Sequence, residues 1–348
     1  MDTKYYCGID LHSKSMVLCI LDRDGKILLR KRVANKQDDF MDAIKPYKAS
    51  IKLGVESTFN WYWLIDLCRE KKLEILLGHA VAMKHIYGGK NKNDNIDSKK
   101  IADLLRSNLL PEAYAYPKEK RAVRDLLRRR CKYLSMRSGL YAHGKTLFYQ
   151  EGCIDISPTA LKSKRKRDSL SDILDDEMSQ LSYQSDITIV KELSDVINKI
   201  EGEILKRAQH ELPKEYYILT SFPGIGKIIA LTMIYEMDTI DRFKRRQDFT
   251  SYCRLARPDR ESNGKRTGNG NSKIGNPFLK CVFMEILNNA TRLSPEIKEY
   301  YDTLKKAFKP LKARAIMANK ACTIVYYMLK KQKPFDIELF KKMTMQNG

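Results

Sequence analysis

The chain has 348 residues, 43% of them hydrophobic, and its 65 Lys and Arg against 43 Asp and Glu give a formal net charge of +22. This charge favours a polyanionic partner, above all nucleic acid, over an acidic small molecule. The N-terminus lacks the pattern of a signal peptide and no apolar run approaches the roughly 18 residues of a membrane-spanning helix, so we expect a cytoplasmic protein with no membrane partner.

The eight cysteines are scattered along the chain without a CxxC pair. A zinc site and a disulfide framework are therefore not expected. We interpret the cysteines as reduced side chains that lie mostly in the core.

Three short β-prone runs open the chain, "KYYCGIDL", "SMVLCILD" and "KILLRKRV", and the turn "DRDG" between the last two predicts an antiparallel meander. A polar helix follows near residues 37–47, and then strand "IKLGVE", helix "NWYWLIDLCREKK", strand "LEILLGHA" and helix "DSKKIADLLRSNLL". The aromatic run in the second helix is interpreted as core packing. This order predicts a mixed sheet covered on both faces, an α/β domain of the RNase H/RuvC-like class over residues 1–117.

Residues 118–214 have helical periodicity, with a break at "SKRKRDSLSD", and predict a coiled-coil or antiparallel helical connector. A solvated helical linker is the alternative. The first helix carries a strongly basic face. We expect this face to bind backbone phosphates, in particular those of RNA, through Arg121, Arg124, Arg128, Arg129 and Lys132.

Residues 215–348 are predicted to form a mostly α-helical C-terminal domain. In "LTSFPGIGKIIALTMIYEM", a Pro-Gly-x-Gly turn precedes an apolar helix, as in a helix-hairpin-helix element. Gly224 and Gly226 would let backbone amides approach a phosphate, although a plain loop between core helices fits the same pattern.

A basic stretch rich in Gly, Asn and Ser, residues 241–280, is expected to be a flexible loop. We expect its cations to approach DNA near the scissile phosphate. The candidate DNA-binding residues are Arg257, Lys265, Arg266 and Lys273.

Four acids of the first domain are expected to converge. Asp10 ends the first predicted strand, Glu56 ends a strand predicted to lie beside it, and Asp94 and Asp97 are three apart at the start of a helix. Their mutual repulsion is relieved when the carboxylates bind a divalent cation, and their hard oxygen atoms suit Mg²⁺ or Mn²⁺. Taken singly, each acid also fits a helix N-cap or a surface position.

The three histidines nearest these acids have no partner at ligand spacing. They are His12, His79 and His85. We therefore interpret all three as structural residues.

At these motifs the sequence resembles a known family. "GIDLHSKS", "GVEST", "KNDNIDSKKIADLL", "FPGIGKIIALTMIYEM" and "FTSYCRLARPDRESNGKRTGNGNSKIGNPFLK" are similar to the insertion-sequence 110 (IS110) family of DEDD transposases, also called bridge-RNA-guided recombinases. The resemblance covers nearly the whole chain. It implies a RuvC-like domain whose catalytic, metal-binding acids are Asp10, Glu56, Asp94 and Asp97.

The resemblance also implies a serine nucleophile shortly before the "K-x-G-N" segment. Ser262 is the closest match, and Ser272 is the alternative because Asn263 stands where the family more often has Gly. A serine that attacks a phosphodiester conserves the bond as phosphoserine, so DNA strands can be rejoined without an external energy source. The family further implies transposition guided by a structured noncoding RNA, and dimers that pair into a tetramer.

Three other functions compete with this interpretation. A RuvC-like structure-specific endonuclease would use the same acids to activate water and would need no serine. An ATPase of the actin/hexokinase type also opens with a strand, Asp and turn, but no second glycine-rich phosphate loop follows. A non-catalytic nucleic-acid-binding protein would explain the charge and leave the clustered acids without a role.

Overall fold

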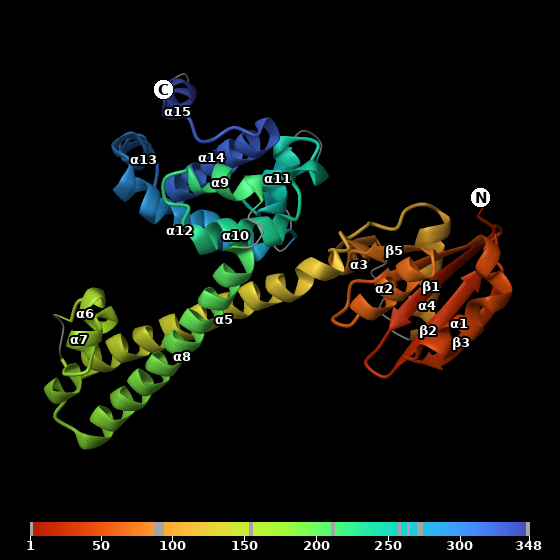
Figure 1. Cartoon of the computed structure of the whole chain (residues 1–348), viewed down its shortest axis with the longest axis horizontal. Helices are drawn as coiled ribbons and strands as arrows, with labels where there is room; N and C mark the ends of the chain where they lie inside the picture. Colours follow the sequence, from red (N-terminus) through yellow and green to blue (C-terminus); the bar gives the residue numbers. More distant parts are fainter. Residues whose placement is uncertain are drawn as a thin grey trace. The chain divides into compact units, whose positions relative to one another are not determined.

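The computed structural model describes residues 3–86, 94–152, 156–209, 213–256, 259–262, 265–269 and 274–345. Its helices and strands are drawn in Figure 1. The chain divides into two units, Met1–Glu119 and Lys120–Gly348.

A five-stranded mixed sheet forms the centre of the first unit. The strands lie in the order β3-β2-β1-β4-β5, and they are β1 (Tyr5–Leu11), β2 (Ser15–Leu21), β3 (Ile27–Ala34), β4 (Ile51–Glu56) and β5 (Glu74–Gly78). Strands β1, β2 and β3 form the predicted antiparallel meander, while β4 runs parallel to β1 and to β5. The predicted α/β class is confirmed, and the sheet is consistent with an RNase H-like domain.

Helices cover both faces of this sheet. On one face, Cys7 and Ile9 of β1 share a core with Phe40 of α1 (Gln37–Ile44) and Leu64 of α2 (Tyr62–Glu70). Trp61 belongs to this core, whereas Phe59 is 80% exposed, so only part of the aromatic run packs inside. On the other face lies α4 (Asp94–Arg106), and the short helix α3 (Ala80–Ile86) follows β5.

Gly8 sets how closely α4 approaches the sheet. A methyl group at this position would overlap the backbone of Ser98 and Ala102 in α4. Because side chains two apart on a strand share a face, Asp10 lies on the same side of β1 as Gly8. The contact at Gly8 therefore brings the first turn of α4, which carries Asp94 and Asp97, toward the end of β1.

Two helices of the second unit, α5 (Lys118–Gln150) and α8 (Glu177–Gln209), pair as an antiparallel hairpin (Figure 1). The direction follows from contacts in which one residue number rises as the other falls: Arg130 with Glu201, Arg137 with Ser194 and His143 with Asp186. Short helices α6 (Pro158–Lys162) and α7 (Lys164–Arg167) lie at the far end, where Phe148, Leu161 and Tyr183 form a small core.

The C-terminal region is mostly helical, as predicted. It comprises α9 (Lys214–Thr220), α10 (Lys227–Met237), α11 (Arg246–Tyr252), α12 (Pro277–Leu293), α13 (Pro295–Ala307), α14 (Pro310–Lys331) and α15 (Ile337–Met345). Its large core also takes in Val123 and Leu127 of α5 and Ile204 and Ala208 of α8. The base of the hairpin and the C-terminal helices thus share one core. The domain boundary expected between residues 214 and 215 stays a prediction.

One expected loop contains a β-hairpin. Strands β6 (Asp259–Ser262) and β7 (Lys265–Asn269) pair antiparallel within the segment expected to be flexible. Within the described parts of the chain, no helix has the length and apolar content that crossing a bilayer requires.

Candidate functional site

Asp10 is a buried carboxyl group at the end of β1, with 9% of its surface exposed. Gly8 and Gly54 pair across β1 and β4, and a side chain at either position would contact α4. Side chains two apart on a strand share a face, so Glu56, two residues after Gly54, lies on the α4 face of β4. The sheet therefore presents both acids on the side covered by α4.

Asp10, His12 and Asp94 form a group that fits a metal ion. One ligand atom from each residue lies within 4.8 Å of the other two. The Nε2 atom of His12 is 3.3 Å from an Oδ2 atom of both Asp10 and Asp94. This nitrogen is buried and makes no hydrogen bond of good geometry. An imidazole nitrogen placed between two carboxylates in this way fits a shared cation site.

A short turn after β1 holds His12 in this position. Its backbone N–H donates to Ser15 O at 2.9 Å. Its carbonyl oxygen accepts hydrogen bonds from the side-chain amides of Asn35 at 2.7 Å and Asn60 at 2.6 Å. Three elements of the chain thus fix the backbone of one residue, which leaves the imidazole directed at the two acids.

The pKa values of Asp10 and Asp94 shift in opposite directions. Burial raises the pKa of Asp10 to about 6, His12 opposes the shift, and the negative charges of Asp94, Asp97 and Glu56 add to it. A hydrogen bond from Arg32, at 2.5 Å, holds the pKa of Asp94 below its usual value. The other three predicted acids therefore all act on Asp10, and a divalent cation would relieve the repulsion there.

Only part of the predicted ligand set falls within the three-residue group. Asp10 and Asp94 belong to it, whereas Glu56 and Asp97 act on Asp10 through their charges. The Asp97 carboxylate lies 3.4 Å from the ammonium group of Lys100, one turn further along α4.

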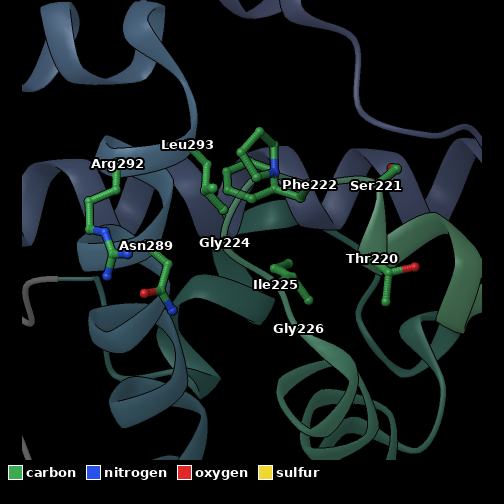
Figure 2. Close-up of a pocket in the computed structure, with 10 residues that line it drawn as sticks. Thr220, Ser221, Phe222, Gly224, Ile225, Gly226, Asn289, Arg292 and Leu293 are labelled. Carbon is green, nitrogen blue, oxygen red and sulfur yellow. The ribbon is translucent and has the colours of Figure 1, made fainter.

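The Pro-Gly-x-Gly turn lines a pocket of about 340 Å³, with Asn289 and Arg292 of α12 on its opposite side (Figure 2). Gly224 has φ +93°, and a methyl group there would lie 2.7 Å from backbone atoms of Ile286 and Ala290. Gly226 is the N-cap of α10, and the space beside its Cα is open. Gly224 therefore allows the turn to pack closely against α12, while the space beside Gly226 is open; that these glycines let a phosphate approach stays a prediction.

The basic face predicted on α5 is partly interior. Arg121 and Arg124 are buried, and Arg124 lies 3.1 Å from the buried carboxylate of Glu236 in α10. Arg128 contacts the same carboxylate at 2.5 Å. The expectation that Arg121 and Arg124 bind phosphates is corrected by their burial. The exposed members of the predicted set are Arg129 and Lys132.

Two family models match this chain. One, for DEDD transposases of IS110 and described as "Transposase", matches residues 7–145, and the other, described as "Transposase IS116/IS110/IS902 family", matches residues 216–302. The chain belongs to the IS110 family of transposases. It is also similar to the transposase for insertion sequence element IS1111A of Coxiella burnetii (strain RSA 493 / Nine Mile phase I), with 22% identity over 94% of this chain and 90% of the relative.

The chain is thus a transposase, an enzyme that cuts and recombines DNA, and its DEDD domain implies dependence on a divalent metal. The acids predicted from the sequence lie within residues 7–145, the part matched by the DEDD model. The pocket at the Pro-Gly-x-Gly turn lies within residues 216–302, the part matched by the second model.

The sequence did not indicate His12 as a ligand of the candidate metal site, because no second histidine or cysteine stands at ligand spacing from it. The available signal was the pair Asp10 and His12 itself, since residues two apart on an extended chain project to one side. His79 does have a structural role, because its Nδ1 atom accepts a hydrogen bond from the backbone of Ala82 at 3.2 Å.

The predicted nucleophile lies in the β-hairpin of the C-terminal region. Ser262 ends β6 and pairs with Lys265, the first residue of β7, while Arg266 pairs with Glu261. Arg257, Ser272 and Lys273 lie outside the described residues.

Proposed function

We propose that this transposase joins Ser262 covalently to DNA, depends on Mg²⁺ or Mn²⁺ bound by its acids, and is guided by a structured noncoding RNA. The observation that carries the proposal is the convergence of Asp10, His12 and Asp94 in a domain of the IS110 family. The nucleophile and the guide RNA come from the resemblance of the sequence to that family.

The residues that would hold the metal are Asp10 and Asp94, with His12 as a third ligand and Glu56 and Asp97 completing the negative surroundings. Carboxylate oxygens suit hard divalent cations, and an imidazole is more readily accepted by Mn²⁺ than by Mg²⁺. When bound, a divalent cation stabilises the negative charge that develops on the phosphate oxygens.

In the proposed step, the Ser262 oxygen attacks the phosphorus of one phosphodiester. The bond from serine to phosphorus forms as the bond to one bridging DNA oxygen breaks. The serine proton passes to a general base, and the departing DNA oxygen takes up a proton to become a hydroxyl. Attack by that or another DNA hydroxyl reverses these changes and rejoins the strands.

The remaining cations have proposed partners of their own. Arg129 and Lys132 would bind RNA phosphates on the exposed face of α5, together with the outer part of Arg128. Gly226 and the cations of residues 257–273, which include Arg257, Lys265, Arg266 and Lys273, would face DNA. The proposed assembly, dimers that pair into a tetramer, rests on the family resemblance alone.

A covalent trap tests this function. Protein, guide RNA and DNA are incubated with Mg²⁺ and denatured, and the expected product is a protein band shifted by DNA that resists SDS. Ser262→Ala should remove the band, while the matched variant Ser272→Ala should keep it. Loss with Ser272→Ala alone would move the nucleophile ten residues onward. Cleaved DNA with no covalent band would instead support the water-activating endonuclease.

A further inference from the structure

Glu236 of α10 is a fully buried carboxylate in the second unit. Arg124 contacts its Oε2 atom at 3.1 Å, and Arg128 contacts both oxygens, at 2.5 and 2.8 Å. The side-chain amide of Asn276 donates to Oε2 at 2.7 Å. A buried charge is tolerated only when it is paired and hydrogen-bonded in this way.

Asn276 connects this charge to the start of α12. While its amide nitrogen donates to Glu236, its Oδ1 atom accepts from the backbone N–H groups of Phe278 at 2.9 Å and Leu279 at 3.1 Å. Asn276 is therefore both the N-cap of α12 and a hydrogen-bond donor to the buried carboxylate of Glu236. The guanidinium group of Arg128 also lies over the ring of Phe278, with 4.6 Å between its Cζ atom and the ring centroid.

The same cluster ties together the two ends of the segment that carries Ser262. The N–H of Asn276 donates to Tyr252 O at 2.5 Å, and the Nε of Arg254 donates to Gly275 O at 2.9 Å. The hydroxyl of Tyr252 donates to the carbonyl oxygen of Glu236 at 3.3 Å. The chain before the segment and the chain after it are thus held side by side over one buried carboxylate.

The backbone at both ends is shaped for this closure. Arg254 and Gly275 both have left-handed backbones, with φ +56° and +101°. A methyl group at Gly275 would lie 2.6 Å from Tyr252 O, so the two strands of chain approach as closely as glycine allows. A left-handed backbone at a non-glycine residue such as Arg254 persists when its surroundings impose it.

We propose that Glu236 and Asn276 are positioning residues, which clamp the ends of residues 255–274 and so hold the proposed nucleophile in register for attack on DNA. This inference rests on the proposed role of Ser262. The physical reason is that a nucleophile misplaced by about 1 Å can lose about a hundredfold in rate even though the protein remains folded. Both residues would act through the chain that closes the segment.

Asn276→Ser is the sharpest test. Serine is about as good an N-cap as asparagine, so α12 keeps its first turn, but its side chain is too short to reach Glu236. Ser294→Ala is the matched control, because it removes the side-chain cap of α13 without touching the clamp. We expect the rate of covalent adduct formation at saturating DNA to fall at least tenfold in Asn276→Ser alone. The apparent KM for DNA and the melting temperature should stay at the control values.

Hydrogen exchange at the Asn276 amide gives a reading that does not depend on the chemistry. Faster exchange of this amide in the serine variant, with Phe278 and Leu279 still protected, would support the clamp. Adduct formation as fast as in the Ser294→Ala control would overturn the positioning role. If the wild-type protein forms no adduct at either serine, the proposed function fails, and unchanged exchange at residue 276 would then also overturn the clamp.

Discussion

At the scale of single residues, the most informative residue of the first unit is Asp10, because burying a carboxylate is energetically unfavourable. Asp10 lies at the end of a buried strand, and three further carboxylates repel its charge. The sequence revealed this residue because a carboxylate in an apolar strand has few structural uses. The sequence did not indicate the position of His12, because a histidine that follows a strand gives the same pattern whether its imidazole faces solvent or two acids.

Neutralising the acids should stop DNA cleavage without releasing nucleic acid. Asp10→Asn, Glu56→Gln, Asp94→Asn and Asp97→Asn each remove one charge near the metal and leave the basic surfaces unchanged. Cleavage assays in Mg²⁺ and gel-shift titrations measure the two properties. Full activity of Asp10→Asn would contradict the metal site.

Removing the His12 imidazole should weaken metal binding. We expect His12→Ala to lower the affinity for Mn²⁺ about tenfold or more, because a neighbour of both carboxylates is lost. Calorimetric titration with Mn²⁺ alone measures this without any turnover. His79→Ala is the control, since His79 caps α3 and should leave the Mn²⁺ affinity unchanged.

The pH dependence of metal binding should follow the proton on Asp10. Its pKa is raised from 3.8 to about 6 in the folded protein, so between these values the folded state holds a proton that the unfolded chain has released. The metal-free protein should therefore lose stability as pH rises through about 6. A cation competes with this proton, so Mn²⁺ affinity should rise from pH 5 to pH 7. An affinity independent of pH, measured by titration, would contradict the assignment.

At the scale of elements, packing decides which residues of a helix are available for binding. The periodicity of α5 predicted a helix with a basic face, and that helix is present. The binding partner of this basic face could not be predicted, because the spacing of the arginines is the same whether they bind phosphates or a glutamate more than a hundred residues away in the sequence. Conversely, Gly8 and Gly54 hold α4 against the sheet, a contact that strand patterns alone do not specify.

The two kinds of arginine on α5 should behave differently when replaced. Arg124→Ala leaves the buried charge of Glu236 short of a partner and should lower the free energy of unfolding by about 3 kcal/mol. Arg129→Ala and Lys132→Ala should change it by less than about 0.5 kcal/mol and weaken RNA binding. Urea unfolding and filter binding separate these effects. Equal destabilisation by all three variants would count against the division.

At the scale of the whole molecule, the sequence predicted the layer architecture and the helical character of the second half. Hydrophobic periodicity and turn residues are local, so they report strands and helices well. The single core shared by α5, α8 and the C-terminal helices depends on contacts between distant segments. For that reason the sequence patterns could not show that residues 118–214 and 215–348 contribute to one core.

The net charge of +22 belongs to the molecule as a whole and should govern its binding to nucleic acid. We expect the affinity for RNA and DNA to fall steeply with salt, because bound phosphates release counterions. A plot of log affinity against log salt concentration measures the slope, and Lys132→Ala should reduce it by about one contact. Binding insensitive to salt would rule out recognition through phosphates.

The shared core of the second unit also sets an order of events during protein synthesis. The first unit is continuous in sequence, and every strand of its sheet has been made once residue 78 is complete. Arg124 and Arg128 are made more than a hundred residues before Glu236, and Val123 and Leu127 likewise precede most of the core that covers them. The base of α5 therefore leaves the ribosome with its cations and apolar side chains in water. Its side chains can be buried only after α10 and α12 have been synthesised.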